Sequence, residues 1–597
     1  MIRKQVVKKH VDFPQGNKVI FDYETDGLMP YTGASPFVAG FEDLNGHVKL
    51  IKVNGPEWGM AKKMIEDTKL EKICHNAKFE IKHSKHLGLN PAGKFHDTMA
   101  LSVLVDEYQP INMAALESKY FPETAHKGSV QDWLKHNTKV FRTEYGRAPN
   151  YSDVPDEVLL PYLEADLDVT AKLFSMWHKN VTQFFPYLYD LETELAWRVV
   201  EMEDRGIRIN IPYCETRITE LRALQQKYEA EIYAAAGVRF NLASPKQVGE
   251  VLVAMGAASP DPETGKVDTS YDTLKLKIGE HPFLDAFITW RTLAKMVDTY
   301  LVPFTQKACG DIIHPSFWQY GKDKAIVTGR FSATDPNMQN IPKGIRGDKD
   351  ALHKLGDIVR QAIIPRDGHA LMFFDYKQIE MVVFTCFSND TYGIEALHRG
   401  EDAYIAPAKR LFGEHVFDAL SPVEKKKKRY DTKEISLSLI YGMGLSSLAG
   451  KLHSDVNHAR MSKNAYFAAM PNARSFITKT QSDLLSCGYV KDLFGRKYHV
   501  PNSMAYKAIN ALCQGFSATI MKRAIMKSVA LKKYGAHVIM TIHDELVLEV
   551  PLEYVDVVAK EGVKLFEEPD LLAAPIRIDV EVSYTNWAEK KPYIFKA

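Results

Sequence analysis

Short apolar runs that lead into acidic residues recur along this chain. Bulky apolar residues from Leu371 onward end at Asp375, and an apolar, β-forming segment at residues 538–550 carries the tripeptide His-Asp-Glu at its centre. Runs of this length and composition predict buried β-strands. Because a carboxylate is costly to bury unless it is paired or holds a metal ion, the second segment predicts a β-hairpin that presents an acidic turn to a site.

These two segments place a carboxylate at two predicted strand ends. Asp375 and Asp544 lie far apart in the sequence, so only the tertiary fold could bring them together. Two carboxylates that meet at strand ends can hold two Mg²⁺ ions, which take oxygen ligands and keep coordination positions open for substrate phosphates. For either acid alone, a solvated strand end is the simpler interpretation.

A helical segment at residues 425–444 orders its polar and apolar residues along one face. Arg429, Lys433, Leu437 and Tyr441 recur at intervals of four and therefore line that face. The face runs from two cations to an apolar and then an aromatic residue. It suits a nucleoside triphosphate, with phosphates on the cations and the base at the apolar end. The alternative is a solvated basic helix.

The N-terminal third repeats the pattern of a strand followed by acids. Strand alternation at residues 19–24 puts Asp22 and Glu24 on one side. A second predicted strand is followed by a helix that carries Glu80, and a later helix carries Tyr162 and Asp166 one turn apart. Acids on one side of a strand can share a metal ion, whereas a solvated turn is the alternative for this pair alone.

The remaining periodicity is mostly helical. Residues 188–208 and 217–235 predict long amphipathic helices, and Ser244 before Pro245 predicts the start of another. Residues 391–487 are helix-rich, and residues 259–273 predict a short polar link. Residues 121–156 are polar and aromatic with turn signals, and we assign them no chemistry.

Composition narrows the class of protein. A chain of 597 residues with 45% hydrophobic and 25% charged residues predicts several globular domains. The net charge of +1 gives no global nucleic-acid signal, so any DNA binding must use local basic surface. The six cysteines form no C-x-x-C pair, which argues against a zinc site and favours a reducing compartment. We expect no signal peptide and no membrane-spanning segment.

Four segments together resemble the family A DNA polymerases, the DNA polymerase I group. DYKQIE at residues 375–380 resembles motif A, the R-x3-K-x7-YG pattern at 429–442 resembles motif B, and HDE at 543–545 resembles motif C. TGRFSATDPNMQNIP at residues 328–342 is a fourth, long match. Leu437 departs from the aromatic residue common in motif B, which puts dideoxynucleotide handling in doubt.

The N-terminal acids resemble the three motifs of DEDD-type 3′→5′ exonucleases, which are fused to many family A polymerases. Glu80 stands where that family has Asp, so the resemblance implies either an active site with adjusted geometry, which we favour, or a weakened one. Asp97 is a further candidate acid that we rank below Glu80. Three nearby histidines could suggest zinc, but solvated helix positions are the better interpretation because no cysteine partners follow: His75, His83 and His86.

The resemblance implies a role for each matching residue. Asp375 and Asp544 would hold two Mg²⁺ ions, with Mn²⁺ as a substitute, while Glu545 and Lys433 would assist catalysis and Tyr162 would orient the water in the exonuclease. The exonuclease metal ligands would be Asp22, Glu24, Glu80 and Asp166. The nucleotide-binding positions would be Arg429, Lys433, Leu437, Tyr441, Gln378 and Glu380. The DNA-binding positions would be Arg330, Gln339, Asn340, Asn510, Gln514 and His543.

The expected fold class is a multidomain α/β and α+β chain, with an RNase H-like exonuclease domain followed by a right-hand polymerase. The predicted division is exonuclease at residues 1–187, thumb at 188–310, palm at 311–390 and 488–597, and fingers at 391–487. Since the exonuclease motifs begin near the N-terminus, we expect no 5′ nuclease ahead of them.

The expected function is template-directed DNA synthesis with 3′→5′ proofreading, in replication or repair. Expected partners are primer–template DNA, dNTPs and replisome proteins, and we expect a cytoplasmic monomer of phage type. Two alternatives stay open. One is a polymerase with a silent exonuclease, and the other is a 3′→5′ nuclease whose polymerase-like half only grips DNA.

Overall fold

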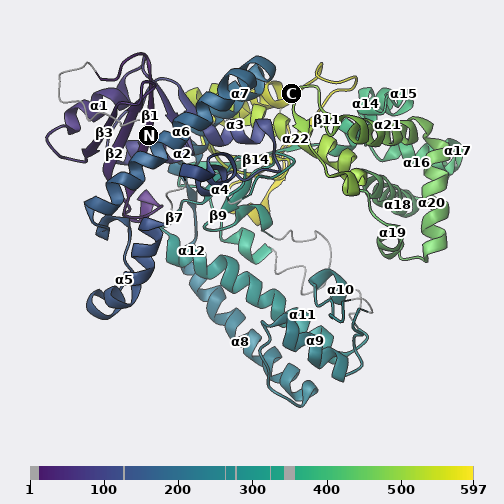
Figure 1. Cartoon of the computed structure of the whole chain (residues 1–597). Helices are drawn as coiled ribbons and strands as arrows, with labels where there is room; N and C mark the ends of the chain where they lie inside the picture. The colour runs from purple at the N-terminus through teal and green to yellow at the C-terminus, as the bar shows by residue number, and fades with distance from the viewer. Residues whose placement is uncertain are drawn as a thin grey trace.

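The computed structural model describes residues 13–124, 128–261, 264–275, 279–322, 324–341 and 357–595. Pro342, the last residue of the 328–342 match, lies outside these ranges. Figure 1 shows an N-terminal lobe built on one β-sheet, a central region built on a second sheet, and two helical projections, one extending below the centre and one to its right.

The N-terminal lobe is a mixed five-stranded sheet in the order β3-β2-β1-β4-β5. Its strands are β1 (Lys18–Thr25), β2 (Pro36–Asp43), β3 (Val48–Lys52), β4 (Glu71–Cys74) and β5 (Phe95–Asp97). Strand β1 pairs antiparallel with β2 and parallel with β4. The helices are α1 (Trp58–Glu66), α2 (Ala77–His86), α3 (Thr98–Val105), α4 (Met113–Tyr120) and α6 (Asp156–Phe184).

Alternation along β1 divides its residues between two cores. Phe21 and Tyr23 pack with residues of α1 and α2, and Ile20 packs on the other face with residues of α3 and α6. Asp22 and Glu24 share the parity of Ile20, so they lie on the α6 side of the strand. The prediction that these two acids share one side is therefore confirmed.

The central sheet is antiparallel, in the order β13-β14-β10-β15-β16. Its strands are β10 (His369–Tyr376), β13 (His537–Ile542), β14 (Glu545–Pro551), β15 (Ile578–Ser583) and β16 (Lys591–Pro592). Helices α22 (Ala508–Lys527) and α23 (Val555–Phe566) contribute to its core. The predicted buried strand before Asp375 and the predicted hairpin at residues 538–550 are both confirmed.

Helix α7 (Pro186–Arg205) lies between the two sheets and contributes side chains to the cores of both. It is followed by the first helical projection, a long arm of α8 (Ile211–Ala236), α9 (Pro245–Ala254), α11 (Pro282–Ala294), a π-helical turn (Lys295–Leu301) and α12 (Val302–Lys307). Ser244 caps α9 by accepting the N–H of Gln247, as its sequence predicted.

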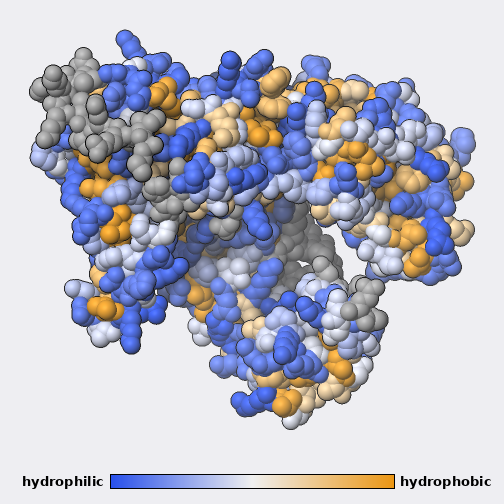
Figure 2. Space-filling model, viewed as in Figure 1, coloured by the Kyte–Doolittle hydropathy of each residue, from blue (hydrophilic) through white to orange (hydrophobic). Residues whose placement is uncertain are grey.

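The second projection contains α14 (Ile379–Phe387), α15 (Thr391–His398), α16 (Ile405–Phe412), α17 (Glu414–Ala419), α18 (Pro422–Ile440), α19 (Leu445–Lys451), α20 (Val456–Ala469) and α21 (Pro471–Cys487). The surface is hollowed between this helical lobe and the α8–α11 arm (Figure 2). Among the described residues, no helix is both long and apolar enough to cross a membrane.

The described part of residues 121–156 contains more helix than its turn signals suggested. It contains α5 (Ser129–Tyr145), a 17-residue helix, and the 3-10 turn η3 (Tyr151–Asp153). Only Val130 of α5 is fully buried, although apolar residues recur at helical spacing along it. The turn signals on both sides of the helix outweighed this periodicity in our interpretation. The apolar positions are Val130, Trp133, Leu134, Val140, Phe141 and Tyr145.

Candidate active sites

The central sheet brings Asp375 and Asp544 to neighbouring strand ends. Strands β13 and β14 are joined by the two-residue turn His543–Asp544, in which His543 has a positive φ of 53°. The carbonyl of Asp544 accepts the N–H of Tyr376 at 3.1 Å. Because that hydrogen bond fixes the turn beside the end of β10, the two carboxylates predicted from separate motifs belong to one site.

The carboxylate of Asp375 is exposed although the residues on both sides of it are buried. The strand register pairs it with Glu545 on β14 and with Asp579 on β15. Residues directly opposite each other in antiparallel strands project to the same face, so three acids form one row across the sheet. Asp579 was not anticipated, because a single exposed acid on a late strand carries no sequence signal.

Cations of the chain already contact this acidic row. Lys590 forms ion pairs with Glu545 and, at 2.7 Å, with Glu581. Lys377 pairs with Asp579 at 2.8 Å. Glu545, predicted as an accessory catalytic acid, is therefore buried in a pair with Lys590, whereas Asp375 faces outward.

Helix α18 presents the predicted nucleotide face. A capping box of Ser421 and Glu424 begins the helix. The Ser-x-x-Glu spacing is visible in the sequence and would have predicted the residue at which the helix begins. Arg429, Lys433 and Leu437 lie on the helix, and Tyr441 is its C-cap residue. The predicted arrangement along one helical face is confirmed, while its binding of nucleotide stays a prediction.

The cationic end of this face is linked to motif A through Asp402. One carboxylate oxygen of Asp402 accepts Arg429 at 2.6 Å and Gln378 Nε2 at 2.6 Å. Gln378 Oε1 in turn accepts the N–H of Ala403 at 2.7 Å. Lys433 forms no ion pair with any described residue, so its ammonium stays available to an incoming anion.

The aromatic end of the face meets Glu380. This buried carboxylate accepts the hydroxyl of Tyr441 at 2.7 Å and pairs with Arg330. Arg330 also lies 3.6 Å from Asp544. Burial, followed by the charge of Glu380, raises the pKa of Tyr441. Four residues predicted from four separate segments therefore form one connected group.

The segment containing Gln339 packs directly on the acidic hairpin. Gln339 donates to the carbonyl of Thr541 at 2.6 Å and accepts the N–H of His543 at 3.1 Å. A pocket of about 290 Å³ is lined by residues that include Arg330, Gln339, Asn340 and His543. The predicted DNA-binding residues of this segment thus share one concave surface, although the amide of Gln339 is already engaged by the hairpin backbone.

Asn510 and Gln514 lie one turn apart on α22, as predicted. The side-chain oxygen of Asn510 is buried without a hydrogen-bond partner, and Gln514 hydrogen-bonds to Tyr441. An orphaned buried amide oxygen is costly in free energy, which is the condition expected of a group that a ligand later satisfies.

The N-terminal acids also come together. Glu80 hydrogen-bonds to Asp22 and interacts electrostatically with Glu24. It is fully buried, and its Oε2 has no hydrogen-bond partner. Burial, then the charge of Asp22, raises the pKa of the Glu80 carboxyl well above its ordinary value. The longer glutamate thus reaches Asp22, while its role as a metal ligand stays a prediction.

Tyr162 and Asp166 complete this site from α6. The charges of Asp166 and Glu24 both act on Tyr162, whose pKa is raised first by burial. The ring of Tyr162 also contacts Tyr151 of η3, with centroids 6.1 Å apart and planes at 67°. Tyr151 was not predicted, since it lies in the segment to which we assigned no chemistry.

Two other predictions about this lobe have different outcomes. Asp97 caps α3 and accepts the N–H groups of Asn76, Ala77 and Met99, so its role is structural, in agreement with its lower rank. The interpretation of the histidines as solvated is wrong for His83, which is completely buried and whose pKa burial lowers to about 3.

Helix α2, which carries Glu80, is fixed to α7 by buried charges. Glu203 accepts Lys78 at 2.7 Å, Lys82 at 3.3 Å and the N–H of Phe317 at 2.7 Å. Glu203 is fully buried. Asp204, the next residue, pairs with Lys85 and with His86 at 3.7 Å. The position of the exonuclease acid therefore depends on a helix shared by both halves of the molecule.

Both acidic groups fit divalent cations. The unpartnered, buried Oε2 of Glu80 beside Asp22 is a donor that a cation would satisfy. At the polymerase-like site, the exposed Asp375 carboxylate stands beside the Asp544 turn. Both sites offer only carboxylate oxygens from the predicted ligands, which is the ligand type that Mg²⁺ and Mn²⁺ prefer.

Comparisons with known proteins agree with this geometry. Residues 211–589 match the model of DNA polymerase family A, and residues 4–181 match a 3′-5′ exonuclease model. The structure resembles the POL domain of Pol1 from M. smegmatis in complex with DNA primer-template and dNTP, with a TM-score of 0.78 and 23% identity, covering 96% of each chain.

Several curated relatives are bacterial enzymes. The DNA polymerase I of Borreliella burgdorferi is 26% identical and covers 96% of this chain and 62% of its own length. That of Synechocystis is 28% identical, covering 98% and 61%, and the thermostable enzyme of Thermus filiformis is 30% identical, covering 71% and 51%.

The chain thus spans about half to three fifths of the length of these relatives. The expected phage type receives no support from them. The expected mixed α/β multidomain fold is confirmed, with an exonuclease domain ahead of a polymerase domain. Because the family model matches more than half of the chain at the residues that build the site, this chain belongs to DNA polymerase family A.

Proposed function

We propose that this chain is a DNA-directed DNA polymerase that extends a primer by two-metal nucleotidyl transfer and trims it by 3′→5′ exonuclease activity. The observation that carries the proposal is the junction of Asp375 with the Asp544 turn through the Tyr376 N–H. The names of the relatives and of the structural neighbour support the same substrates, which are primer–template DNA and dNTPs.

The polymerase acids act as ligands at a charged, open surface. Asp375 and Asp544 would hold the cations, which would lower the pKa of the primer 3′-OH and balance the charge of the triphosphate and of the departing pyrophosphate. Asp375 is exposed toward substrate, while Arg330 beside Asp544 limits mutual repulsion of the acids before substrate binds.

The α18 face would bind the nucleotide. Lys433 would receive phosphate oxygens and supply a proton to pyrophosphate, and Arg429 would exchange its partner Asp402 for phosphate. Glu380, held between Arg330 and Tyr441, would stand against a ribose 2′-OH and favour deoxynucleotides. Leu437 would supply an apolar wall, and Gln378 would support the phosphate end.

The exonuclease would use its own metal ligands, Asp22, Glu24, Glu80 and Asp166. Tyr162 would orient the attacking water, because its hydroxyl lies among Glu24, Asp166 and Tyr151. We propose that Glu80 supports activity, since its free Oε2 is buried beside Asp22. A silent exonuclease is the second candidate, and the raised pKa of Glu80 favours it only when no cation is bound.

The right-hand division remains part of the proposal. We assign the exonuclease to residues 1–187, the thumb to 188–310, the palm to 311–390 and 488–597, and the fingers to 391–487. Helix α7, at the start of the proposed thumb, packs against both sheets, whereas α8–α11 form the free arm. A monomer acting in the bacterial cytoplasm, with replisome proteins as partners, completes the proposal.

A 5′-labelled primer on a longer template tests the proposal directly. In Mg²⁺, we expect extension with dNTPs and shortening without them. Extension without shortening would support the silent exonuclease. Shortening alone would overturn polymerisation in favour of a nuclease with a DNA-gripping half. A variant carrying both Asp375→Asn and Glu80→Gln controls for contaminating enzymes.

A further inference from the structure

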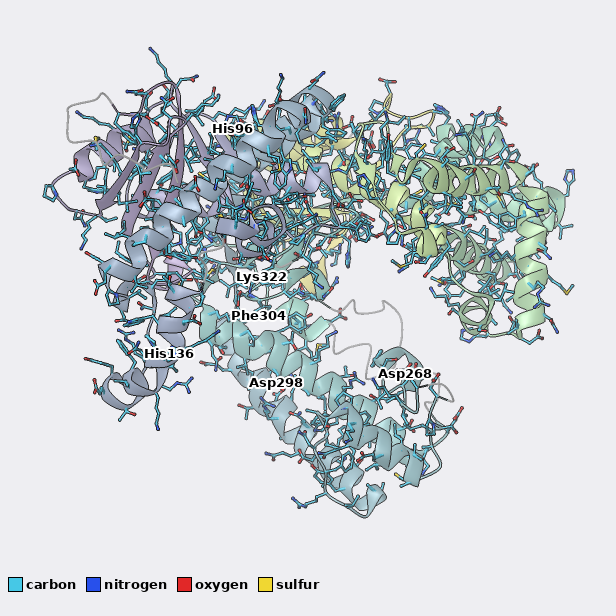
Figure 3. The ribbon with its side chains drawn as sticks, viewed as in Figure 1. His96, His136, Asp268, Asp298, Phe304 and Lys322 are labelled. Atoms are coloured by element: carbon cyan, nitrogen blue, oxygen red, sulfur yellow. The ribbon has the colours of Figure 1, made fainter. Side chains whose placement is uncertain are left out.

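Helix α5 projects from the N-terminal lobe, apart from the body of the sheet (Figure 1). Only its first turns join a core, in which Val130, Trp133 and Leu134 pack with residues that include Tyr151 and Tyr162. The outer turns extend beyond this contact, where His136 is seen on the projecting helix (Figure 3).

The base of α5 is connected to the exonuclease acids by side chains. Gln131 Nε2 donates to the hydroxyl of Tyr151 at 2.6 Å. Tyr151 hydrogen-bonds to Tyr162, whose hydroxyl lies within reach of the charges of Asp166 and Glu24. The helix therefore begins at the proposed exonuclease site and leads away from it.

One face of α5 carries cations outward from that contact. Spacings of four, three and four residues place Gln131, Lys135, Thr138 and Arg142 along a single face, with Lys139 on its flank. All three cations are exposed, and none forms an ion pair with a described residue. The next position on the face, after another three residues, is Tyr145, a 63% exposed aromatic residue.

Among the acids of the same segment, Asp132 lies in the first turn of α5 on the flank that also carries Lys139, two turns before it, and the other acids lie away from the face. Asp153 is held by Arg147 at 2.6 Å and Asp156 by Lys52 at 2.6 Å. At 100° per residue, Glu144 lies more than a quarter turn from the cationic face. The face therefore offers unpaired positive charge and an exposed aromatic ring, the two features by which proteins hold single-stranded nucleic acid without reading its sequence.

We propose that α5 binds the single-stranded 3′ segment of DNA that enters the exonuclease site, with Lys135, Lys139 and Arg142 on its phosphates and Tyr145 against a base. This inference rests on the proposed exonuclease and adds the strand-binding surface to it. The hydrogen bonds from Gln131 through Tyr151 to Tyr162 place the first turn of α5 next to the proposed exonuclease site, so the bound DNA strand would run outward from that turn. The axial rise of about 1.5 Å per residue spaces the cations along the helix, so that they would contact successive phosphates.

The test compares two triple variants of the full chain on a 5′-labelled 20-nucleotide single strand. K135Q/K139Q/R142Q removes the proposed contacts, and K62Q/K63Q/K69Q removes the same charge from exposed residues elsewhere in the lobe. We expect the first variant to raise KM for shortening about tenfold or more with kcat nearly unchanged, and to reduce the salt dependence of binding by about 2 in log–log slope. The control variant should match the unmodified chain.

Substrate length separates strand binding from misfolding. A trinucleotide occupies the metal acids without reaching the outer turns of α5, so the first variant should cleave it within about twofold of normal, while primer extension stays normal. Equal loss on both lengths, no loss on either, or equal effects of both triple variants would overturn the inference. If the unmodified chain shortens neither substrate in Mg²⁺, the proposed exonuclease itself fails, which is a separate result.

Discussion

The two acidic sites of this chain differ in how their charges are held before any ligand arrives. In the N-terminal site, Glu80 is buried beside Asp22 with an unpartnered oxygen, and its pKa is raised. In the central site, Asp375 is exposed, and the neighbouring acids Asp544 and Glu545 have Arg330 and Lys590 as counterions.

This contrast has a physical consequence. A carboxylate that is buried next to other carboxylates ionises fully only when a cation is bound, since desolvation and repulsion both favour its protonated form. Asp375, by contrast, is exposed to solvent, and cations of the chain already contact its acidic neighbours. The exonuclease should therefore depend more steeply on divalent cation and on pH than polymerisation does.

The largest expected effect is the loss of primer extension when the exposed Asp375 of the central site is changed. Asp375→Asn removes one of two proposed metal ligands in a site that holds substrate charge, so primer extension should fall on the order of a thousandfold or more. Shortening of single-stranded DNA should be unchanged. Loss of both activities in a variant with a normal melting curve would contradict the division into two independent sites.

Substitutions of Glu80 test the buried N-terminal site. Glu80→Gln keeps the volume but removes the ligand charge, so shortening should fall about a hundredfold or more while extension persists. Glu80→Asp restores the acid of the related exonucleases on a side chain that is one methylene shorter. It should retain more activity than Gln at saturating Mg²⁺. Gln and Asp variants of equal activity would mean that Glu80 is not a ligand.

The next effect concerns what holds Glu80 in place. Lys78→Met removes one cation from Glu203 but leaves Lys82 and the Phe317 N–H. A buried carboxylate that loses one of its partners should cost the N-terminal lobe about 2–3 kcal/mol, seen as a lower unfolding temperature. Lys82→Met, whose contact is longer, should cost less, and Lys69→Met on the surface serves as the control.

Local patterns allowed much of the catalytic geometry to be predicted. Asp375 and Asp544 follow from apolar runs that end in acids, and the α18 face follows from a four-residue spacing. What joins these motifs could not be predicted in the same way. Asp402 reaches Arg429 from a loop 27 residues away, and Glu203 reaches Lys78 across 125 residues. Neither acid has a local pattern that distinguishes it from a solvated one.

Helix α5 and the histidine His83 show two further limits on what could be predicted from the sequence. The helix carries apolar residues at helical spacing from Val130 to Tyr145, but the turn signals around it outweighed this pattern in our interpretation. Because the helix projects from the lobe, most of that apolar face is not buried. His83 lies in a polar-looking stretch, KFEIKHSKH, in which Lys78 and Lys82 pair with the buried Glu203 of α7. Without those partners in view, a buried helix carries the same pattern as an exposed one.

Tyr151 gives a smaller and more specific test of the exonuclease site. Tyr151→Phe removes the hydroxyl that joins Gln131 to Tyr162 but keeps the ring contact. Since Tyr162 would lose one constraint on its hydroxyl, kcat for shortening should fall roughly tenfold with KM little changed. Gln131→Leu should give a weaker form of the same effect. A change in KM alone would indicate strand binding rather than orientation of Tyr162.

The smallest expected effect lies where the two halves meet. His499, between β12 (Lys497–Tyr498) and α22, bonds through Nδ1 to the buried Glu107 of the N-terminal lobe at 3.0 Å. The hydrogen bond to Glu107 raises the pKa of His499. A raised folded-state pKa stabilises the fold fully below the ordinary value near 6.5, and this stabilisation is lost as pH rises through the folded-state value.

Unfolding free energy should therefore decrease by up to about 1 kcal/mol as pH rises from about 6 to 8, an amount limited by partial solvent exposure of the pair. His499→Gln should flatten this dependence without changing extension or shortening at fixed pH. Glu107→Gln, which removes the partner, should flatten it equally. A slope that survives in both variants would show that other groups cause the pH dependence, and the contact would then join the two halves without sensing pH.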